Sequence, residues 1–270
     1  MDINKLLLRA TTGLIYVVLI VGCIILGQIP LTLLASLFAI LAVIEFEKIT
    51  HELSPRTLPA LILDIAGCVT LTFSWIIWPL YIWVMILLSR MTLELYMKSS
   101  TPIANLAKSM MTQLYIGLPL ALMCCLGNWF NLNVVLVVFI MIWINDTGAF
   151  LSGSMLGRHK LFERISPKKS WEGFIGGLVF NLIAATLFCT YGSSFFGIGD
   201  SLPIWLGLGA VVTIFATWGD LVESLLKRSL KIKDSGNIMP GHGGILDRID
   251  SLLFVMPATL LYLTLFLIFL

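Results

Sequence analysis

Long apolar runs constrain this chain more than any other feature, because most of them are long enough to cross a lipid bilayer. A helix needs about 20 apolar residues to span a hydrocarbon core of about 30 Å. Hydrophobic residues make up 59% of the 270 positions. Backbone groups inside a bilayer must be satisfied within their own segment, so the runs are predicted to be helices. The nine predicted spans are 11–29, 31–45, 59–78, 80–96, 112–127, 132–152, 173–195, 202–222 and 251–270.

The positions of the basic residues predict how these helices are oriented. All 17 lysine and arginine residues lie in alternate connecting segments, and the other connections contain none. Cytoplasmic loops of membrane proteins are enriched in Lys and Arg. We therefore expect an all-α, polytopic integral membrane protein with about nine transmembrane helices, a cytoplasmic N-terminus and an outside C-terminus. The basic segments are 1–10, 45–58, 89–111, 153–172 and 223–250.

The two halves of the chain differ in their polar content. Residues 1–130 form apolar spans with short, sparsely charged connections, and we expect a scaffold that can face lipid or a second copy. Residues 131–270 hold the unusual polar groups, so they are predicted to form the catalytic region. Its two cytoplasmic loops are expected at 153–172 and 223–250.

Four aspartates are predicted to lie at one membrane depth. Asp146 and Asp220 are near the inner ends of their spans, and Asp247 and Asp250 precede the last span with a spacing that places them on one helical face. Each aspartate alone could cap a helix or pair with a base. Four carboxylates beside hydrocarbon are costly, however, and favour a functional site. Oxygen ligands of this kind suit Mg²⁺ held together with substrate phosphates.

A glycine-rich turn follows Pro240 and contains His242, Gly243 and Gly244. Such a turn lets the backbone approach a ligand closely. If a helix starts near Ile245, its free N–H groups would also face an anion. The turn alone could simply lead into a helix, but the basic side chains near it favour phosphate binding. These bases are Lys227, Arg228, Lys233 and Arg248.

The loop 153–172 carries a second group of basic residues. Its charge could serve only topology and contact with anionic lipid. The hydroxyls of Ser166 and Ser170 beside Lys168 and Lys169 suggest a further role. Glu172 could cap or pair at the start of the next span.

Glycines with a spacing of four residues flank this loop, at 153 and 157 and again at 173 and 177. This spacing brings membrane helices close together, so we predict close helix packing at these glycines. The sequence contains no P-loop motif, no zinc-ligand spacing and no nucleophile-elbow motif. No nucleic-acid partner is expected.

Three segments together resemble the phosphatidate cytidylyltransferase family, also called CDP-diacylglycerol synthases. The main one covers 224–250 and carries Ser224-x-x-Lys-Arg, Lys233-Asp, and His-Gly-Gly-Ile-x-Asp-Arg-Ile-Asp ending at Asp250. The others are Trp143-x-x-Asp-Thr-Gly-Ala-Phe and Ser166-Pro-Lys-Lys-Ser-x-Glu-Gly. The hydropathy of the whole chain is also similar to that of the bacterial members, which implies a bacterial cytoplasmic (inner) membrane protein.

The resemblance implies the reaction of CTP with phosphatidate to CDP-diacylglycerol and pyrophosphate, in phospholipid biosynthesis at the cytoplasmic membrane face. It implies Mg²⁺ as the cofactor, alone or with a second cation, and a homodimer. The implied metal ligands are Asp220 and Asp247, completed by Asp146 and Asp250. The other implied site residues handle phosphate or substrate. They are Lys227, Arg228, His242 and Arg248 in catalysis, and Ser166, Lys168, Lys169, Ser224, Lys233, Gly243 and Gly244 in substrate binding.

Two alternatives stay open from the sequence. One is a CTP-dependent enzyme that acts on another lipid, such as a polyprenol kinase. The other is an ion-coupled transporter with the aspartates on its ion path. Transporters usually place such sites near the membrane midplane and often show repeated halves. The predicted position of the aspartates at one face and the absence of a visible repeat disfavour the second alternative.

Overall fold

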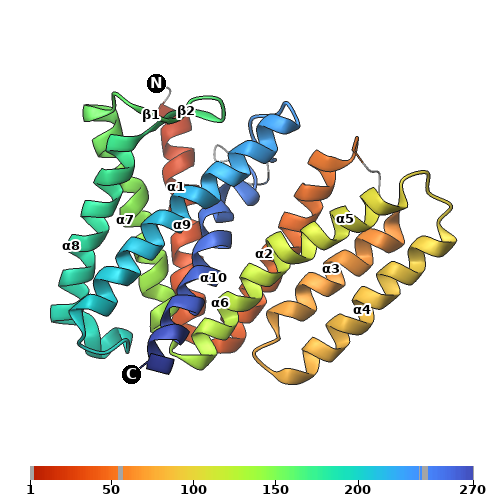
Figure 1. Ribbon diagram of the computed structural model, residues 1–270, viewed down its shortest axis with the longest axis horizontal. Coiled ribbons are helices and arrows are strands. Elements are labelled where there is room, and N and C mark those ends of the chain that lie inside the picture. Colours follow the sequence, from red (N-terminus) through yellow and green to blue (C-terminus); the bar gives the residue numbers. More distant parts are fainter. Residues whose placement is uncertain (1–2, 54–56, 237, 239–242, 270) are drawn as a thin grey trace. The chain divides into compact units, whose positions relative to one another are not determined.

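The computed structural model describes residues 3–53, 57–236, 238 and 243–269, and helices dominate it (Figure 1). Of the residues that the structure describes, 82% are helical, which confirms the predicted all-α class. The elements are α1 Ile3–Leu26, α2 Gln28–Thr50, α3 Leu58–Thr72, α4 Ile77–Tyr96, α5 Pro102–Thr112, η1 Gln113–Gly117, α6 Leu118–Trp129, α7 Leu132–Leu156, β1 Lys160–Phe162, β2 Ser166–Ser170, α8 Trp171–Phe196, α9 Leu202–Ser229 and α10 Leu246–Phe269. The strands β1 and β2 pair antiparallel in a short hairpin.

The protein is a polytopic membrane protein, and most of its helices match the predicted spans. Among the described residues, seven helical segments are long and apolar enough to cross a membrane. Two shorter apolar helices lie at Ala10–Leu26 and Leu58–Thr72. Each predicted span overlaps one of these helical segments. The count of nine crossings and the orientation of the termini remain predictions.

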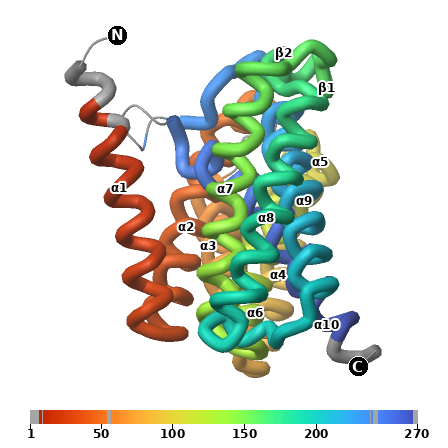
Figure 2. Tube along the Cα trace, turned by 90° about the vertical axis from the view of Figure 1, so that its left-hand side faces the viewer, coloured from red at the N-terminus to blue at the C-terminus, as the bar shows by residue number. Residues whose placement is uncertain are grey.

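The chain forms two compact units. The first contains Met1–Asn128 and Asp234–Arg248, and the second contains Trp129–Lys233 and Ile249–Leu270. In the second unit α7, α8 and α9 pack against one another (Figure 2). In the first unit α3 packs against α2 and α4. The predicted division into a scaffold half and a catalytic half concerns function, and it stays a prediction.

Glycines allow α7 and α8 to approach closely, as the four-residue spacing predicted. A Cβ atom at Gly173 would lie 3.0 Å from the carbonyl oxygen of Ala149 and 3.4 Å from the Cα of Gly153. A Cβ at Gly177 would lie 2.5 Å from the side-chain oxygen of Asn145. Side chains at these positions would therefore push the two helices apart. This contact places the hairpin between α7 and α8 beside the second unit's polar residues.

Buried polar residues join three helices of the first unit. Arg90 on α4 donates to Glu94 at 2.8 Å and to the hydroxyl of Ser109 on α5 at 3.0 Å. Ser109 in turn donates to Asp64 on α3 at 2.9 Å. All four side chains are at least nine-tenths buried. Asp64 thus belongs to a hydrogen-bonded network that holds α3, α4 and α5 together, because charges inside apolar surroundings need partners.

Candidate active site

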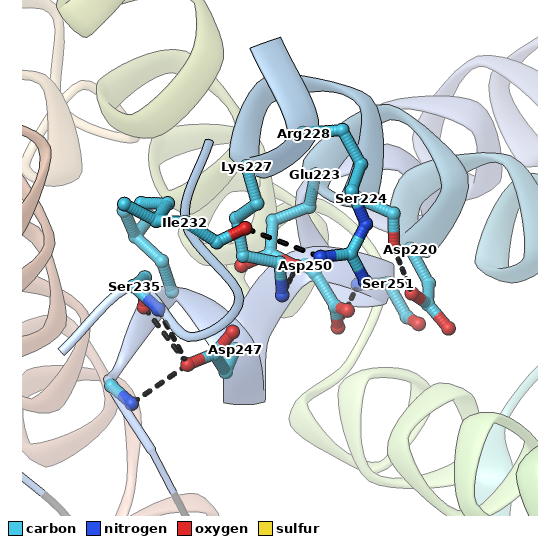
Figure 3. A network of polar contacts seen from close by, with 12 residues as sticks. Asp220, Glu223, Ser224, Lys227, Arg228, Ile232, Ser235, Asp247, Asp250 and Ser251 are labelled. Atoms are coloured by element: carbon cyan, nitrogen blue, oxygen red, sulfur yellow. Dashed lines mark hydrogen bonds and ion pairs between the residues drawn. The ribbon is translucent and has the colours of Figure 1, made fainter. Parts of the chain in front are cut away.

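Three carboxylates form a cluster in the second unit. One oxygen from each of Asp220, Glu223 and Asp250 lies within 4.8 Å of the others (Figure 3). Asp220 and Glu223 are three residues apart on α9 and therefore share a face of that helix. Asp250 comes from the first turns of α10. The structure thus brings two of the predicted aspartates together and adds Glu223, which the sequence analysis did not select.

A close contact between α9 and α10 creates this cluster. A Cβ atom at Gly219 would lie only 2.5 Å from the carbonyl oxygen of Asp250. The hydroxyl of Ser251 donates to the carbonyl of Ala216 at 3.2 Å. Glycine at position 219 therefore lets the two backbones meet next to the carboxylates. The side chains of Asp220 and Asp250 can then reach the same place from different helices.

Two lysines lie against the carboxylate cluster. The ammonium of Lys169, from β2, lies 2.6 Å from Asp220 and 3.4 Å from the carbonyl oxygen of Thr217. Lys227 forms an ion pair with Glu223 one turn earlier on α9. Glu223 is only 3% exposed. Negative charges held this close together repel one another, and the two lysine ammonium groups offset part of that repulsion.

The donor set fits a magnesium ion. The three residues offer hard oxygen ligands that converge from two helices. Mg²⁺ is commonly held in proteins by one or two carboxylates, with phosphate oxygens and water completing its shell. A cluster that is partly exposed on Asp220 and Asp250 and buried on Glu223 suits such shared coordination. We therefore assign Asp220, Glu223 and Asp250 as the candidate metal ligands of the second unit.

A pocket of about 290 Å³ opens beside Asp220. Its polar wall includes Asp146 from α7, Lys168 and Lys169 from β2, and Asp220 from α9. Apolar side chains, among them Phe150 and Phe174, form the rest of the wall. The pocket therefore combines two lysine ammonium groups with apolar surface. Such a surface can accept a ligand that carries both phosphate and apolar or aromatic parts.

The hairpin that carries the lysines is fastened at both ends. Ser170 is the N-cap of α8, and its hydroxyl accepts a hydrogen bond from the N–H of Gly173 at 3.1 Å. Glu172 accepts hydrogen bonds from the N–H groups of Arg158 and His159 at 3.1 and 3.2 Å, and it contacts the His159 ring at 2.6 Å. The predicted pairing of Glu172 is thereby confirmed. These contacts hold Lys168 and Lys169 at the pocket.

The last turns of α9 carry more of the predicted residues. The helix continues past its predicted span to Ser229, so Ser224, Lys227 and Arg228 are helical and not part of a loop. Ser224 donates to Asp220 at 3.3 Å. Arg228 donates to the backbone carbonyls of Ile165 at 3.4 Å and Ile232 at 3.2 Å. Ser166 on β2 is half-buried, and Lys233 after α9 is exposed.

Asp247 has partners in the first unit. One oxygen of its carboxylate accepts hydrogen bonds from the N–H of Ser235 at 3.0 Å and the N–H of Gly244 at 2.8 Å. Gly243 adopts a positive φ of 88°, which suits glycine. Arg248 is exposed, and His242 lies outside the described residues. The phosphate-binding roles predicted for Gly243, Gly244 and His242 stay predictions.

The N-terminus of α10 binds a carboxylate of the protein itself. Glu45, on α2, accepts hydrogen bonds from the N–H groups of Ile245 at 3.0 Å and Leu246 at 2.9 Å. No role for Glu45 was predicted from the sequence. Nothing near position 45 in the sequence indicates a partner 200 residues away, whereas the spacing of Glu223 from Asp220 was a signal that could have been used.

Known proteins match this chain over nearly its whole length. The sequence model of the Cytidylyltransferase family matches residues 7–266. A protein of Bacillus subtilis (strain 168) named phosphatidate cytidylyltransferase is 32% identical over 96% of this chain and 97% of its own length.

Staphylococcal proteins with the same name show higher identity over a shorter stretch. The protein of Staphylococcus aureus (strain COL) is 46% identical over 129 residues, and that of Staphylococcus haemolyticus (strain JCSC1435) is 47% identical over 129 residues. Each of these two alignments covers 47% of this chain and 47% of the relative, so the match spans about half the length of the staphylococcal proteins.

Proposed function

Because this chain belongs to the cytidylyltransferase family, we propose that it transfers the cytidylyl group of CTP to phosphatidate, which yields CDP-diacylglycerol and pyrophosphate. The names of the bacterial relatives support phosphatidate as the acceptor. The observation that carries the proposal is the carboxylate cluster of Asp220, Glu223 and Asp250 with Lys169 on its edge.

The chemistry asks for charge neutralisation more than for proton transfer. An oxygen of the phosphatidate phosphate attacks the α-phosphorus of CTP. A new P–O bond forms as the bond between the α-phosphorus and the bridging oxygen breaks, and pyrophosphate leaves with that oxygen. The attacking phosphate is already ionised, so no strong base is required. Bringing two polyanions together is the main difficulty, and positioning with electrostatic stabilisation meets it.

Each residue of the site has a place in this proposal. Lys169 and Lys168 bind phosphate oxygens at the mouth of the pocket, and Lys227 offsets the charge that develops on pyrophosphate. Asp220, Glu223 and Asp250 would hold Mg²⁺, with Asp146 of the same unit as a further predicted ligand. Asp247, in the first unit, also stays a predicted ligand. Bound Mg²⁺ would supply charge neutralisation and would orient the CTP phosphates. The apolar wall with Phe150 and Phe174 offers contact surface for the apolar or aromatic parts of a substrate.

The same proposal places the reaction at the cytoplasmic membrane face. The phosphate of phosphatidate lies in the headgroup layer, and CTP arrives from the cytoplasm. The basic residues of segments 153–172 and 223–250 support this side of the membrane by their charge. Protease accessibility of these segments in inside-out bacterial vesicles, or labelling of cysteines introduced into them, tests the orientation. The predicted homodimer is tested by mass measurement of the detergent-purified protein.

Pyrophosphate release tests the reaction itself. Purified protein receives CTP, Mg²⁺ and phosphatidate, and each is left out in turn. We expect release that needs all three, with CDP-diacylglycerol as the lipid product. Turnover with a polyprenol in place of phosphatidate would replace the proposed acceptor. Ion flux through proteoliposomes without any turnover would overturn the enzyme assignment in favour of transport.

Aspartate variants connect the reaction to the site. Asp220→Asn is expected to lower turnover by on the order of a hundredfold, since it removes a charge at the centre of the cluster. Asp200 is the matched control, because it is an exposed aspartate of the same unit in the connection between α8 and α9. Asp200→Asn is expected to keep wild-type turnover. Equal activity of both variants would remove Asp220 from the proposal.

A further inference from the structure

A buried glutamate organises the start of α10 in the first unit. Glu45 is only 1% exposed, although it lies in an apolar helix. Both of its carboxylate oxygens accept hydrogen bonds: Oε1 from the N–H of Ile245 at 3.0 Å, and Oε2 from the N–H of Leu246 at 2.9 Å. The first N–H groups of a helix have no partner within the helix and carry partial positive charge. Glu45 therefore serves α10 as an N-terminal cap supplied by another helix.

Ser235 links this cap to Asp247. The Ser235 hydroxyl lies 3.1 Å from an oxygen of Glu45 and 3.0 Å from Oδ2 of Asp247. A hydroxyl has one hydrogen, so the two carboxylates share it. The same Oδ2 atom also accepts a hydrogen bond from the N–H group of Ser235 (Figure 3). It accepts another from the N–H group of Gly244. The Asp247 carboxylate is thus held by groups that Glu45 itself keeps in place.

The backbone around Glu45 has room for this arrangement only because two residues lack side chains. A Cβ atom at Gly236 or at Gly244 would collide with the Glu45 carboxylate. A Cβ at Gly243, where φ is positive, would lie 2.6 Å from Oδ2 of Asp247. Three glycines thus allow the chain to fold tightly around two carboxylates. Such a close fit restricts where the Asp247 side chain can point.

We propose that Glu45 is a positioning residue for Asp247: by binding the first turn of α10 and Ser235, it sets the orientation of the Asp247 carboxylate for phosphate and Mg²⁺ chemistry. The inference rests on the proposed function, in which Asp247 is a predicted metal ligand. The neighbouring groups of Glu45 all donate hydrogen bonds to its carboxylate, so this role requires that both of its oxygens act as acceptors. Glutamine offers one oxygen and would turn an NH₂ group toward a backbone N–H.

The test compares two buried carboxylates of the same helix. Glu47 is also buried on α2, but it pairs with Lys108 on α5 at 2.8 Å and with His51 at 3.4 Å. Glu45→Gln is expected to raise the Mg²⁺ concentration for half-maximal turnover by on the order of ten- to a hundredfold, as is usual when the support of a ligand is lost. Glu47→Gln is expected to leave this concentration unchanged, even if the protein melts at a lower temperature. Glu45→Asp, which keeps the charge with a shorter reach, is expected to lie between wild type and Glu45→Gln.

A second readout does not depend on turnover. With CTP present and phosphatidate absent, Mg²⁺ is expected to raise the melting temperature of wild type and of Glu47→Gln. The same addition is expected to raise that of Glu45→Gln less at equal Mg²⁺. If Glu45→Gln does not fold, Ser235→Ala is tested in its place. This variant removes the shared hydroxyl but keeps the hydrogen bonds from the first N–H groups of α10 to Glu45. Ser235→Ala is then expected to shift the Mg²⁺ dependence in the same direction.

The outcomes separate the two proposals. Wild-type protein without cytidylyl transfer overturns the proposed function. Wild-type turnover together with a Mg²⁺ dependence of Glu45→Gln equal to that of Glu47→Gln overturns only the role of Glu45. If the folded Ser235→Ala protein takes over the test, a wild-type Mg²⁺ dependence has the same meaning.

Discussion

The Lys169 ammonium lies 2.6 Å from the Asp220 carboxylate, although one residue is on the hairpin before α8 and the other is on α9. This ion pair joins the basic loop to the acidic cluster within the second unit. Both groups also line the pocket. A ligand phosphate in the pocket would therefore contact a lysine that is already paired with a carboxylate. The negative charge of a substrate phosphate in the pocket would therefore lie next to the Lys169–Asp220 ion pair.

Replacing Lys169 by methionine is expected to reduce turnover by on the order of a hundredfold, because it removes a positive charge beside the transferring phosphate. Steady-state pyrophosphate release measures the effect. Lys160, an exposed lysine on β1 of the same hairpin, is the control, and Lys160→Met is expected to keep most of the activity. A Lys169→Met enzyme as active as Lys160→Met would contradict the role of the ion pair.

Glu223→Gln tests the residue that the sequence analysis left out. Glu223 is almost fully buried beside Asp220 and Asp250, so loss of its charge is expected to lower the affinity for Mg²⁺ at least as much as loss of a group that supports a ligand, which is about ten- to a hundredfold. The measurement is the Mg²⁺ concentration at half-maximal turnover. The exposed Glu163, within the β1–β2 hairpin connection, provides a control with the same substitution. Identical Mg²⁺ curves for Glu223→Gln and wild type would remove it from the ligand set.

Gly219→Ala is expected to impair turnover without changing any charge. The added Cβ would meet the carbonyl oxygen of Asp250 at 2.5 Å, and a backbone atom cannot swing away as a side chain does. The helices must separate, which moves Asp250 away from Asp220. Gly22→Ala on α1 is the control, since its Cβ would meet nothing within 4 Å. That variant is expected to be neutral or slightly more stable. Wild-type turnover of Gly219→Ala would show that the separation does not matter.

Arg90→Met is expected to destabilise the first unit. The substitution leaves Glu94 and Asp64 buried without the guanidinium between them, and breaking such a pair costs on the order of 3 kcal/mol. A lower melting temperature in detergent measures this loss. The exposed Lys98 after α4 is the control, with Lys98→Met expected to melt within a few degrees of wild type. An unchanged melting temperature for Arg90→Met would mean that the network does not stabilise the protein.

Much of the fold was predictable because its causes are local. Apolar runs become helices wherever they are, since the bilayer leaves the backbone no other way to satisfy its hydrogen bonds. The four-residue glycine spacing similarly predicted close helix packing, because it presents one smooth helix face, and the contact of Gly153 with Gly173 is packing of this kind. The ends of helices were less predictable: α9 runs on to Ser229, where the ion pair between Glu223 and Lys227 supports its last turns.

The candidate site was predictable in part. A common membrane depth indicated that Asp220 and Asp250 could meet, and the structure brings them together. Depth is a coordinate along the bilayer normal, which hydropathy reports. Which residues are neighbours at a given depth depends on which helices pack together. Lys169 beside Asp220, and Glu223 as the third carboxylate, therefore required the packed helices.

The sequence by itself determined that this chain is helical, spans a membrane and carries acidic and basic residues of a phosphate-handling kind. Apolar burial and charge placement are properties of each segment, so they can be predicted without knowing the segment's neighbours. Only the tertiary structure decided that the N–H groups of Ile245 and Leu246 bind Glu45. A hydrogen bond needs its donor and acceptor about 3 Å apart, and for residues 200 positions apart that distance exists only after the helices have packed.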